Sequence, residues 1–275
     1  MTLVRYWNGE ETMMDMTGTA ADIEAPAINK ITFQDVKDAL REGYQDYTEN
    51  RTDVLFLCLI YPLLMYVAVR MAFGYGVIPL IYPVFTGAAL LGPIVAVGLY
   101  HVSWRREQGL ETHWRDAFKV FRHHSIGSIG LMTLILLGLY FAWLTAAITI
   151  YEFTLGKGTV WYLSPAEFLQ AVLTTKQGLM MIVLGNLVGF FFAVLALCIS
   201  VVSFPMLVDK DVGPMTAILT SMRGCAANTG PIAAWGVIVV VLLLLGSLPF
   251  FIGLAVAMPV LAHATWHLYK KLVRF

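Results

Sequence analysis

Long uncharged tracts alternate with shorter polar segments along the chain. The windows without Asp, Glu, Lys or Arg are 54–69, 71–104, 123–151, 177–208 and 224–269. A helix needs about 20 residues to cross the hydrocarbon layer of a bilayer, so each of the first four windows suggests one span. The last window, with 46 residues, accommodates two spans, because the sequence Gly-Ser-Leu-Pro at 246–249 favours a turn.

The pattern therefore predicts an all-α, polytopic membrane protein with six transmembrane helices. Composition agrees, because 13% of the residues are charged against about 25% in soluble domains. A transmembrane β-barrel would alternate apolar and polar residues in segments of about ten, and the tract VIVVVLLLLG does not alternate. We expect a polar, acidic, flexible arm at 1–31 and a single transmembrane domain at 32–275. The expected spans are approximately 54–73, 78–103, 126–151, 178–204, 231–246 and 250–269.

Three amphipathic segments precede pairs of these spans, and each is predicted to form an interfacial helix. The first is opened by Thr32 and Asp35 in a capping-box-like arrangement, and Pro214 suits the first position of the third. In the third segment we expect Thr216, Thr220 and Arg223 to face water. The apolar stripes are Phe33, Val36, Leu40, Tyr44 and Tyr47; Leu110, Trp114, Ala117, Phe118 and Phe121; and Val212, Met215, Ile218 and Met222.

The second and sixth spans end alike, in GPIVAVGLYHVSWRRE and MPVLAHATWHLYKK. Internal symmetry of this kind is common where membrane folds arose by duplication. Two interpretations stay open. One is a threefold repeat of an amphipathic helix plus a helical hairpin, and the other is that cytoplasmic connections between spans are ordinarily amphipathic.

Basic residues are distributed unevenly between the two sets of connections. Fifteen Lys and Arg lie in the termini and in the connections at 104–125 and 205–230, against three in the opposite connections. Basic residues stay on the cytoplasmic side, so both termini are predicted to be cytoplasmic in a multi-pass protein of a bacterial inner membrane. Residues 1–53 carry 11 acids and five bases, a balance that does not suit nucleic acid.

Few side chains offer chemistry. His263 and His267 share a helix face, and His101 could approach them through the repeat, so these three are the candidates for a haem or metal site. The competing interpretation is that they are interfacial histidines beside Trp and Tyr. Asn186 is the most polar mid-span side chain, and it suggests either an interhelical hydrogen bond or a contact with a solute.

No catalytic motif is present, and no catalytic residue or cofactor is predicted. The spans carry no ionisable residue near their centres, which argues against an ion-coupled transporter. The carboxylates Glu107, Glu111, Asp209 and Asp211 stand among Arg and Lys, which is typical of a solvated, salt-bridged surface. The three cysteines, at 58, 198 and 225, show no CxxC spacing and are expected to pack as small residues.

Two stretches carry a resemblance, GPIVAVGLYHVSWRREQG with HWRDAF, and SFPMLVDKDVGPMTAILTSMRGCAANTG. With the N-terminal arm, they resemble a bacterial integral-membrane family of unknown function, over roughly residues 30–272. Some members of that family are provisionally labelled as cytochrome c oxidase subunits. The resemblance implies a six-helix inner-membrane protein and supplies no catalytic residue. The oxidase label finds no support in the histidines, which lie at span ends or in the connection at 101–124.

The leading hypothesis is a non-enzymatic accessory, assembly or scaffold subunit of another membrane complex, respiratory or similar. Its expected partners are membrane lipids and either another membrane protein or further copies of itself. The alternative is a channel or carrier for a neutral or amphipathic solute, with a polar path through Asn186, Thr145, Thr149, Ser200 and Ser203. An enzyme ranks third, because no nucleophile or base with a partner is evident.

Overall fold

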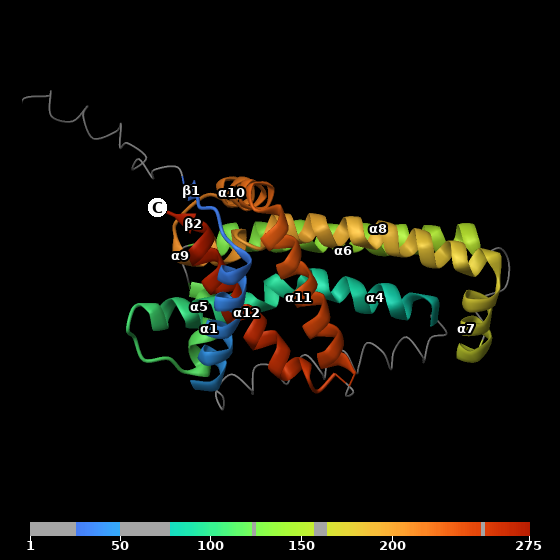
Figure 1. Cartoon of the computed structure of the whole chain (residues 1–275), viewed down its shortest axis with the longest axis horizontal. Coiled ribbons are helices and arrows are strands. Elements are labelled where there is room, and N and C mark those ends of the chain that lie inside the picture. Colours follow the sequence, from blue (N-terminus) through green and yellow to red (C-terminus); the bar gives the residue numbers. More distant parts are fainter. Residues whose placement is uncertain (1–25, 50–77, 123–124, 157–163, 249–250) are drawn as a thin grey trace, which may run out of the picture.

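The computed structural model describes residues 26–49, 78–122, 125–156, 164–248 and 251–275, and these residues are almost entirely helical (Figure 1). The predicted first span at 54–73 and most of the predicted N-terminal arm lie outside the described residues. The helices are α1 (Phe33–Glu49), η1 (Ile78–Leu80), α4 (Ile81–Ala88), η2 (Ala89–Leu91), α5 (Gly92–Glu107), η3 (Trp114–Arg122), α6 (Ile126–Thr154), α7 (Pro165–Thr174), α8 (Lys176–Ser200), α9 (Ser203–Asp209), α10 (Pro214–Ala227), α11 (Thr229–Ser247) and α12 (Leu254–Leu272). Two short strands, β1 (Ala27–Ile28) and β2 (Val273–Arg274), complete the set.

Within the described ranges, four helical stretches are long and apolar enough to cross a membrane. They are Ile81–Glu107, Ile126–Thr154, Lys176–Asp209 and Thr229–Ser247. They correspond to the predicted second, third, fourth and fifth spans, extended at their ends. The all-α membrane class is therefore supported, whereas the count of six is not confirmed. The predicted sixth span forms helix α12, but most of that helix is buried among other helices, and its last turn is basic.

Two long helices, α6 and α8, lie side by side along the long axis of the molecule (Figure 1). Helix α4 packs on α6 at one side, and α7 lies across the far end of the pair. Helices α11 and α12 form a hairpin whose turn lies part-way along α6 and α8, well short of α7 (Figure 1). Gly246 and Gly253 make this tight turn, because a Cβ on Gly253 would lie 2.7 Å from the Cα of Gly246.

Trp143 of α6 contacts both α4 and α8. Its ring nitrogen donates a hydrogen bond to the carbonyl oxygen of Pro83 at 2.9 Å. A Cβ on Gly87 of α4 would lie 2.7 Å from the Trp143 ring, and one on Gly189 of α8 would lie 3.1 Å from it. The indole therefore lies between two glycines, as close helix packing in membranes requires.

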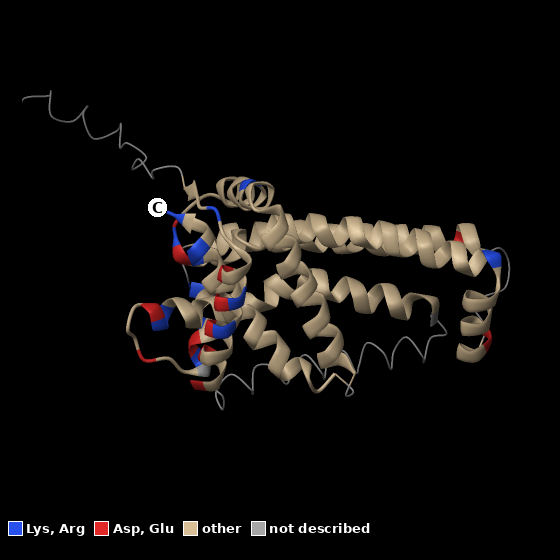
Figure 2. Cartoon of the chain, viewed as in Figure 1, with Lys and Arg blue, Asp and Glu red and all other residues tan. Residues whose placement is uncertain are grey.

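The end of the molecule opposite α7 holds both ends of the described chain and most of its charge. Strands β1 and β2 pair there in antiparallel register, with Ile28 opposite Val273. The Lys, Arg, Asp and Glu side chains gather at the same end, whereas the α7 end carries few (Figure 2). Helix α9 contacts α5, α10 and α12 at this end, and its residues from Ser203 to Val208 are all buried.

Helix α1 begins as predicted and packs on α12. The side chain of Asp35 accepts a hydrogen bond from the backbone of Thr32 at 2.7 Å, and the Thr32 hydroxyl accepts one from the backbone of Asp35 at 3.2 Å. The buried face differs from the predicted stripe, because Phe33 and Tyr44 are exposed. Small residues replace them at the contact, and the buried set is Val36, Ala39, Gly43, Asp46 and Tyr47.

The other two amphipathic segments also turn a different face inward. In η3 the buried residues include Asp116, Ala117 and Val120, while Phe118 is exposed, as is Leu110 before the helix. In α10 the expectation that Thr220 faces water is wrong, because Thr220 is 3% exposed. The physical reason in α10 is space: its inner face lies close to α8 and α9, and it is built from Ala217, Thr220, Ser221, Gly224 and Cys225.

Two of the three amphipathic segments pack on the helices that precede them in the chain, η3 on α5 and α10 on α8 and α9. Helix α1 packs instead on the last described helix, α12. The other two segments are connected through the chain to the helices on which they pack. Helix α1 and helix α12 are instead linked by the pairing of β1, which precedes α1, with β2, which follows α12. This common arrangement is compatible with a repeat but does not confirm three equivalent units.

Candidate functional site: the charged cluster at one end of the helices

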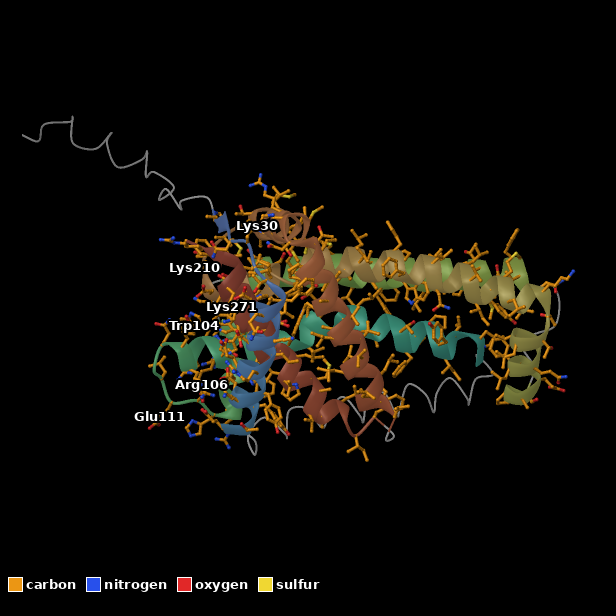
Figure 3. All side chains as sticks on the ribbon, in the orientation of Figure 1. Lys30, Trp104, Arg106, Glu111, Lys210 and Lys271 are labelled. Atoms are coloured by element: carbon orange, nitrogen blue, oxygen red, sulfur yellow. The ribbon has the colours of Figure 1, made fainter. Side chains whose placement is uncertain are left out.

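The last two turns of α12 carry polar side chains that meet α1, α5 and α9. Helix α12 is kept close to α1 by Gly43, where a Cβ would lie 2.4 Å from the backbone nitrogen of Ala264. Because the two backbones approach so closely, polar side chains of α1 and α12 near this contact can reach each other. The labelled residues Arg106 and Lys271 lie at this end of the molecule (Figure 3).

One chain of charges links α12 to α1 and α5. Asp46 Oδ2 lies 2.8 Å from His267 Nε2, and Asp46 Oδ1 lies 3.2 Å from Arg106 Nη1. Glu42 lies 3.3 Å from His267 Nδ1 and 3.0 Å from Lys271 Nζ. Both ring nitrogens of His267 therefore face carboxylates from α1, so the imidazole connects two successive turns of that helix.

A second chain of charges links α12 to α5 and α9. Lys270 Nζ lies 3.1 Å from Glu107 and 3.3 Å from Asp209. Tyr269 donates a hydrogen bond to Asp209 at 2.8 Å, and the Trp266 ring nitrogen donates one to Glu107 at 3.3 Å. The side chain of Asp209 is only 6% exposed. The prediction of salt-bridged carboxylates thus holds for this pair, but Asp209 is not solvated.

Asp116 anchors the connection at 104–122 to the same end. Its carboxylate lies 3.4 Å from Arg105 and 2.6 Å from Lys119, and it accepts a hydrogen bond from the backbone of His113 at 2.9 Å. Burial alone would raise the pKa of Asp116, but the bonds from Lys119 and His113 and the charge of Arg105 outweigh it, so the pKa is lowered. The carboxylate is therefore held in its charged form.

The pKa of Asp46 is also set by opposing effects of burial and of neighbouring groups. Burial acts to raise its pKa, whereas the hydrogen bond and charge of His267 and the charge of Arg106 act to lower it. The net effect is a lowered pKa. A carboxylate stabilised in this way strengthens the packing of α1 on α12 as long as it stays ionised.

The three candidate histidines lie at this end, but each contacts a different neighbour. His267 faces the α1 carboxylates, and His101 is buried and stacked on Trp104 at 5.5 Å between ring centroids. His263 is 1% exposed, and its Nδ1 lies 2.7 Å from the hydroxyl of Ser103. Among the described residues, no group of three His, Cys, Asp or Glu is placed to hold a metal ion.

Asn186 lies away from this cluster, on α8. It accepts a hydrogen bond from the hydroxyl of Tyr82 on α4 at 3.0 Å, and its amide donates to the carbonyl of Ile182 at 2.8 Å. This geometry matches the interhelical hydrogen bond, which is one of the two roles suggested by the sequence.

Residues 81–209 match the model of a family described as "Predicted integral membrane protein (DUF2189)". This match supports the resemblance to an integral-membrane family of unknown function, and the cytochrome c oxidase label is not part of that description. No curated protein and no solved structure matches the chain.

Sequence reasoning missed the partners in the cluster, Asp46 and Arg106 above all. Asp46 lies on an amphipathic helix whose polar positions are expected to face water, and its partner His267 lies 221 residues further along the chain. The one signal in the sequence was the spacing of the carboxylates at 42, 46 and 49. Residues three or four apart share a helix face, so this spacing indicates an acidic side of α1. Helix α7 was also missed, although Ser164 and Glu167 form a capping box visible in the sequence.

Proposed function

We propose that the protein is a non-enzymatic accessory, assembly or scaffold subunit of a bacterial inner membrane, whose spans pack against another membrane protein such as a subunit of a respiratory complex. The observation that supports this proposal is a set of open glycines on the two longest helices. A Cβ at Gly127, Gly130 or Gly138 of α6, or at Gly185 of α8, would meet no atom of the described residues within 4 Å.

Glycine inside a helix costs about 1 kcal/mol relative to alanine. Gly87 and Gly189 offset that cost by admitting Trp143, but the four open glycines have no such contact within the described chain. In membranes, small residues allow the backbone of a partner helix to approach closely. Leu134 and Phe141, which flank Gly138, are 64% and 60% exposed and offer apolar surface to the same partner.

The charged cluster supports a structural role for the polar end. Its carboxylates and bases pair with one another across α1, α5, α9 and α12. Such pairs fix the packing of helices and do not by themselves supply a nucleophile or a general base. The surfaces available to a partner are then the exposed apolar faces of the long helices α6 and α8.

The alternative of a solute channel is less well supported. Thr145 and Thr149 are exposed, and each hydroxyl donates to a carbonyl one turn earlier in α6. Ser200 and Ser203 are buried at the junction of α8 and α9. Burial therefore separates Ser200 and Ser203 from the exposed Thr145, Thr149 and Asn186 in the described structure, which weakens the case for one continuous polar path.

The direct test compares Gly138→Ala and Gly138→Leu with the wild type. With no intramolecular contact at this position, Gly138→Ala should leave the fold intact or stabilise it by up to about 1 kcal/mol. Both variants should weaken association, Leu more than Ala. Val237→Leu, which enlarges an exposed side chain of α11, is the control and should change neither property.

Association is measured by native gel electrophoresis of mildly solubilised membranes, with crosslinking and mass spectrometry to name what co-migrates. Recovery of further copies of this chain alone would replace the accessory role with a homo-oligomer. A wild-type protein that migrates alone at native abundance would refute both.

The proposed orientation places the charged end in the cytoplasm. Support comes from the gathering of both described chain ends and most charges at that end (Figure 2). In intact cells, a membrane-impermeant thiol reagent should label a cysteine introduced at position 176, beside α7, and should not label one at position 41 in α1. The reverse labelling pattern would invert the topology.

A further inference from the structure

The outer surface of α10 is divided into an apolar sector and a polar edge. Met215, Leu219 and Met222 are 65%, 43% and 45% exposed, and they recur at spacings of three and four residues, so they share one side of the helix. Thr216 and Arg223 are also exposed and lie seven residues apart, which is close to two turns. They therefore form an edge beside the apolar sector.

Helix α10 lies across the long helices. It is seen nearly end-on in Figure 1, whereas α6 and α8 run horizontally across the picture. It contacts both of them, and it directly precedes α11. Helices α8 and α11, which α10 contacts, also carry exposed apolar side chains, among them Val194 and Val237 at 42% and 62% exposed.

The charge on and beside α10 is positive. The helix has no acidic residue and carries Arg223. Lys30 is exposed and donates a hydrogen bond to the carbonyl of Ala227 at the C-terminal end of α10 (Figure 3). Two carboxylates precede the helix. Asp209 is engaged by Tyr269 and Lys270, and the exposed Asp211 stands next to the exposed Lys210, so Arg223 and Lys30 leave the balance positive.

We propose that the outer face of α10 binds anionic phospholipid at the membrane surface. The apolar sector enters the boundary between headgroups and acyl chains, and Arg223, with Lys30 beside it, contacts lipid phosphate. A helix with an apolar side, a basic edge and an axis across the spans has the geometry of an interfacial helix. Long basic side chains reach from such a depth to the headgroups. This inference does not depend on the proposed protein partner.

The depth of α10 is tested with an environment-sensitive nitrobenzoxadiazole probe on single cysteines, in a background where Cys58, Cys198 and Cys225 are replaced by alanine. The protein is reconstituted in nanodiscs whose lipids carry bromine on the acyl chains. A probe at Leu219→Cys should be quenched strongly by bromine, and one at Thr216→Cys clearly less. A probe at Leu219→Cys that bromine does not quench overturns the proposal. Access of iodide would then indicate water, and exclusion of iodide would indicate a covering protein.

The choice of lipid is tested with Arg223→Gln in nanodiscs of phosphatidylcholine with and without phosphatidylglycerol. One basic residue near an anionic surface corresponds to about a fivefold change in affinity. The preference for phosphatidylglycerol, measured from lipids retained in native mass spectrometry, should fall by roughly that factor. Arg41→Gln, which removes an exposed charge from α1, should leave it unchanged. An equal preference in wild type and Arg223→Gln overturns the role of anionic lipid.

Discussion

Asp46 Oδ2 lies 2.8 Å from Nε2 of His267, although the two residues are 221 positions apart in the chain. This contact joins the first described helix to the last and is shared with Arg106 of α5. Three segments that are distant in sequence therefore meet at one carboxylate. Loss of that charge should loosen all three contacts together.

Replacing Asp46 with asparagine is expected to destabilise the packing of α1 on α12 by about 1.5–3 kcal/mol, the range for hydrogen bonds to charged groups. The side chain is 11% exposed, so water cannot fully replace His267 and Arg106. Hydrogen exchange of the α1 backbone amides in nanodiscs reports this loosening. Asp38→Asn is the matched control, because Asp38 is half-buried and pairs with the exposed Arg41 of the same helix. Equal protection of α1 in both variants would show that the cluster does not hold the helix.

The lowered pKa of Asp46 predicts a dependence on acid. A carboxyl whose pKa is lowered by folding stabilises the protein above its unfolded pKa of about 3.9, and that contribution is lost as the pH falls through the folded value. The part of the α1 protection that depends on Asp46 should therefore be fully present above about pH 4 and should decline below it. In Asp46→Asn this part of the decline should be absent. A wild-type profile identical to that of the variant would contradict the prediction.

Gly43→Ala should separate α1 from α12. The new Cβ would lie 2.4 Å from the nitrogen and 2.6 Å from the Cα of Ala264, and backbone atoms cannot move aside as a flexible side chain can. We expect a net loss of about 1–3 kcal/mol, as for other overpacked sites. Gly127→Ala, which meets no atom of the described residues within 4 Å, should be neutral or stabilising. Thermal unfolding in one detergent compares the two variants.

The sequence predicted the membrane class well because transmembrane helices are specified by local composition. The four candidate spans fall within a few residues of the predicted ranges, and the start of α1 at Thr32 follows from local capping. The buried faces of the amphipathic helices were not predictable in this way. Periodicity identifies the apolar side, but the contact with α12 needed small residues such as Gly43 and Ala39. The charge pairs depend on which helices lie next to one another, and a single sequence does not reveal those neighbours.

The contact between Trp143 and Gly189 offers a coupling test. Gly189→Ala alone should cost about 1 kcal/mol or more, because its Cβ would lie 3.1 Å from the far edge of the indole. Trp143→Phe removes that edge and also the hydrogen bond to Pro83. In the background of Trp143→Phe, Gly189→Ala should therefore be neutral or stabilising. Additive costs in the double variant, measured by thermal unfolding, would show that the two residues are not coupled.

Aspartate substitutions distinguish the buried faces of the amphipathic segments from the predicted ones. Thr220 of α10 is 3% exposed, and its hydroxyl donates to the carbonyl of Thr216 at 2.7 Å, so Thr220→Asp places a charge against α8 and α9 and should sharply reduce the yield of monodisperse protein. Thr216→Asp, on the exposed edge, should stay within about 0.5 kcal/mol of the wild type. By the same reasoning Val36→Asp should be severe, because Val36 is 1% exposed, and Phe118→Asp should be mild, because Phe118 is 51% exposed. If Thr216→Asp and Phe118→Asp were as damaging as Thr220→Asp and Val36→Asp, the faces of α10 and η3 would be oriented differently from those described.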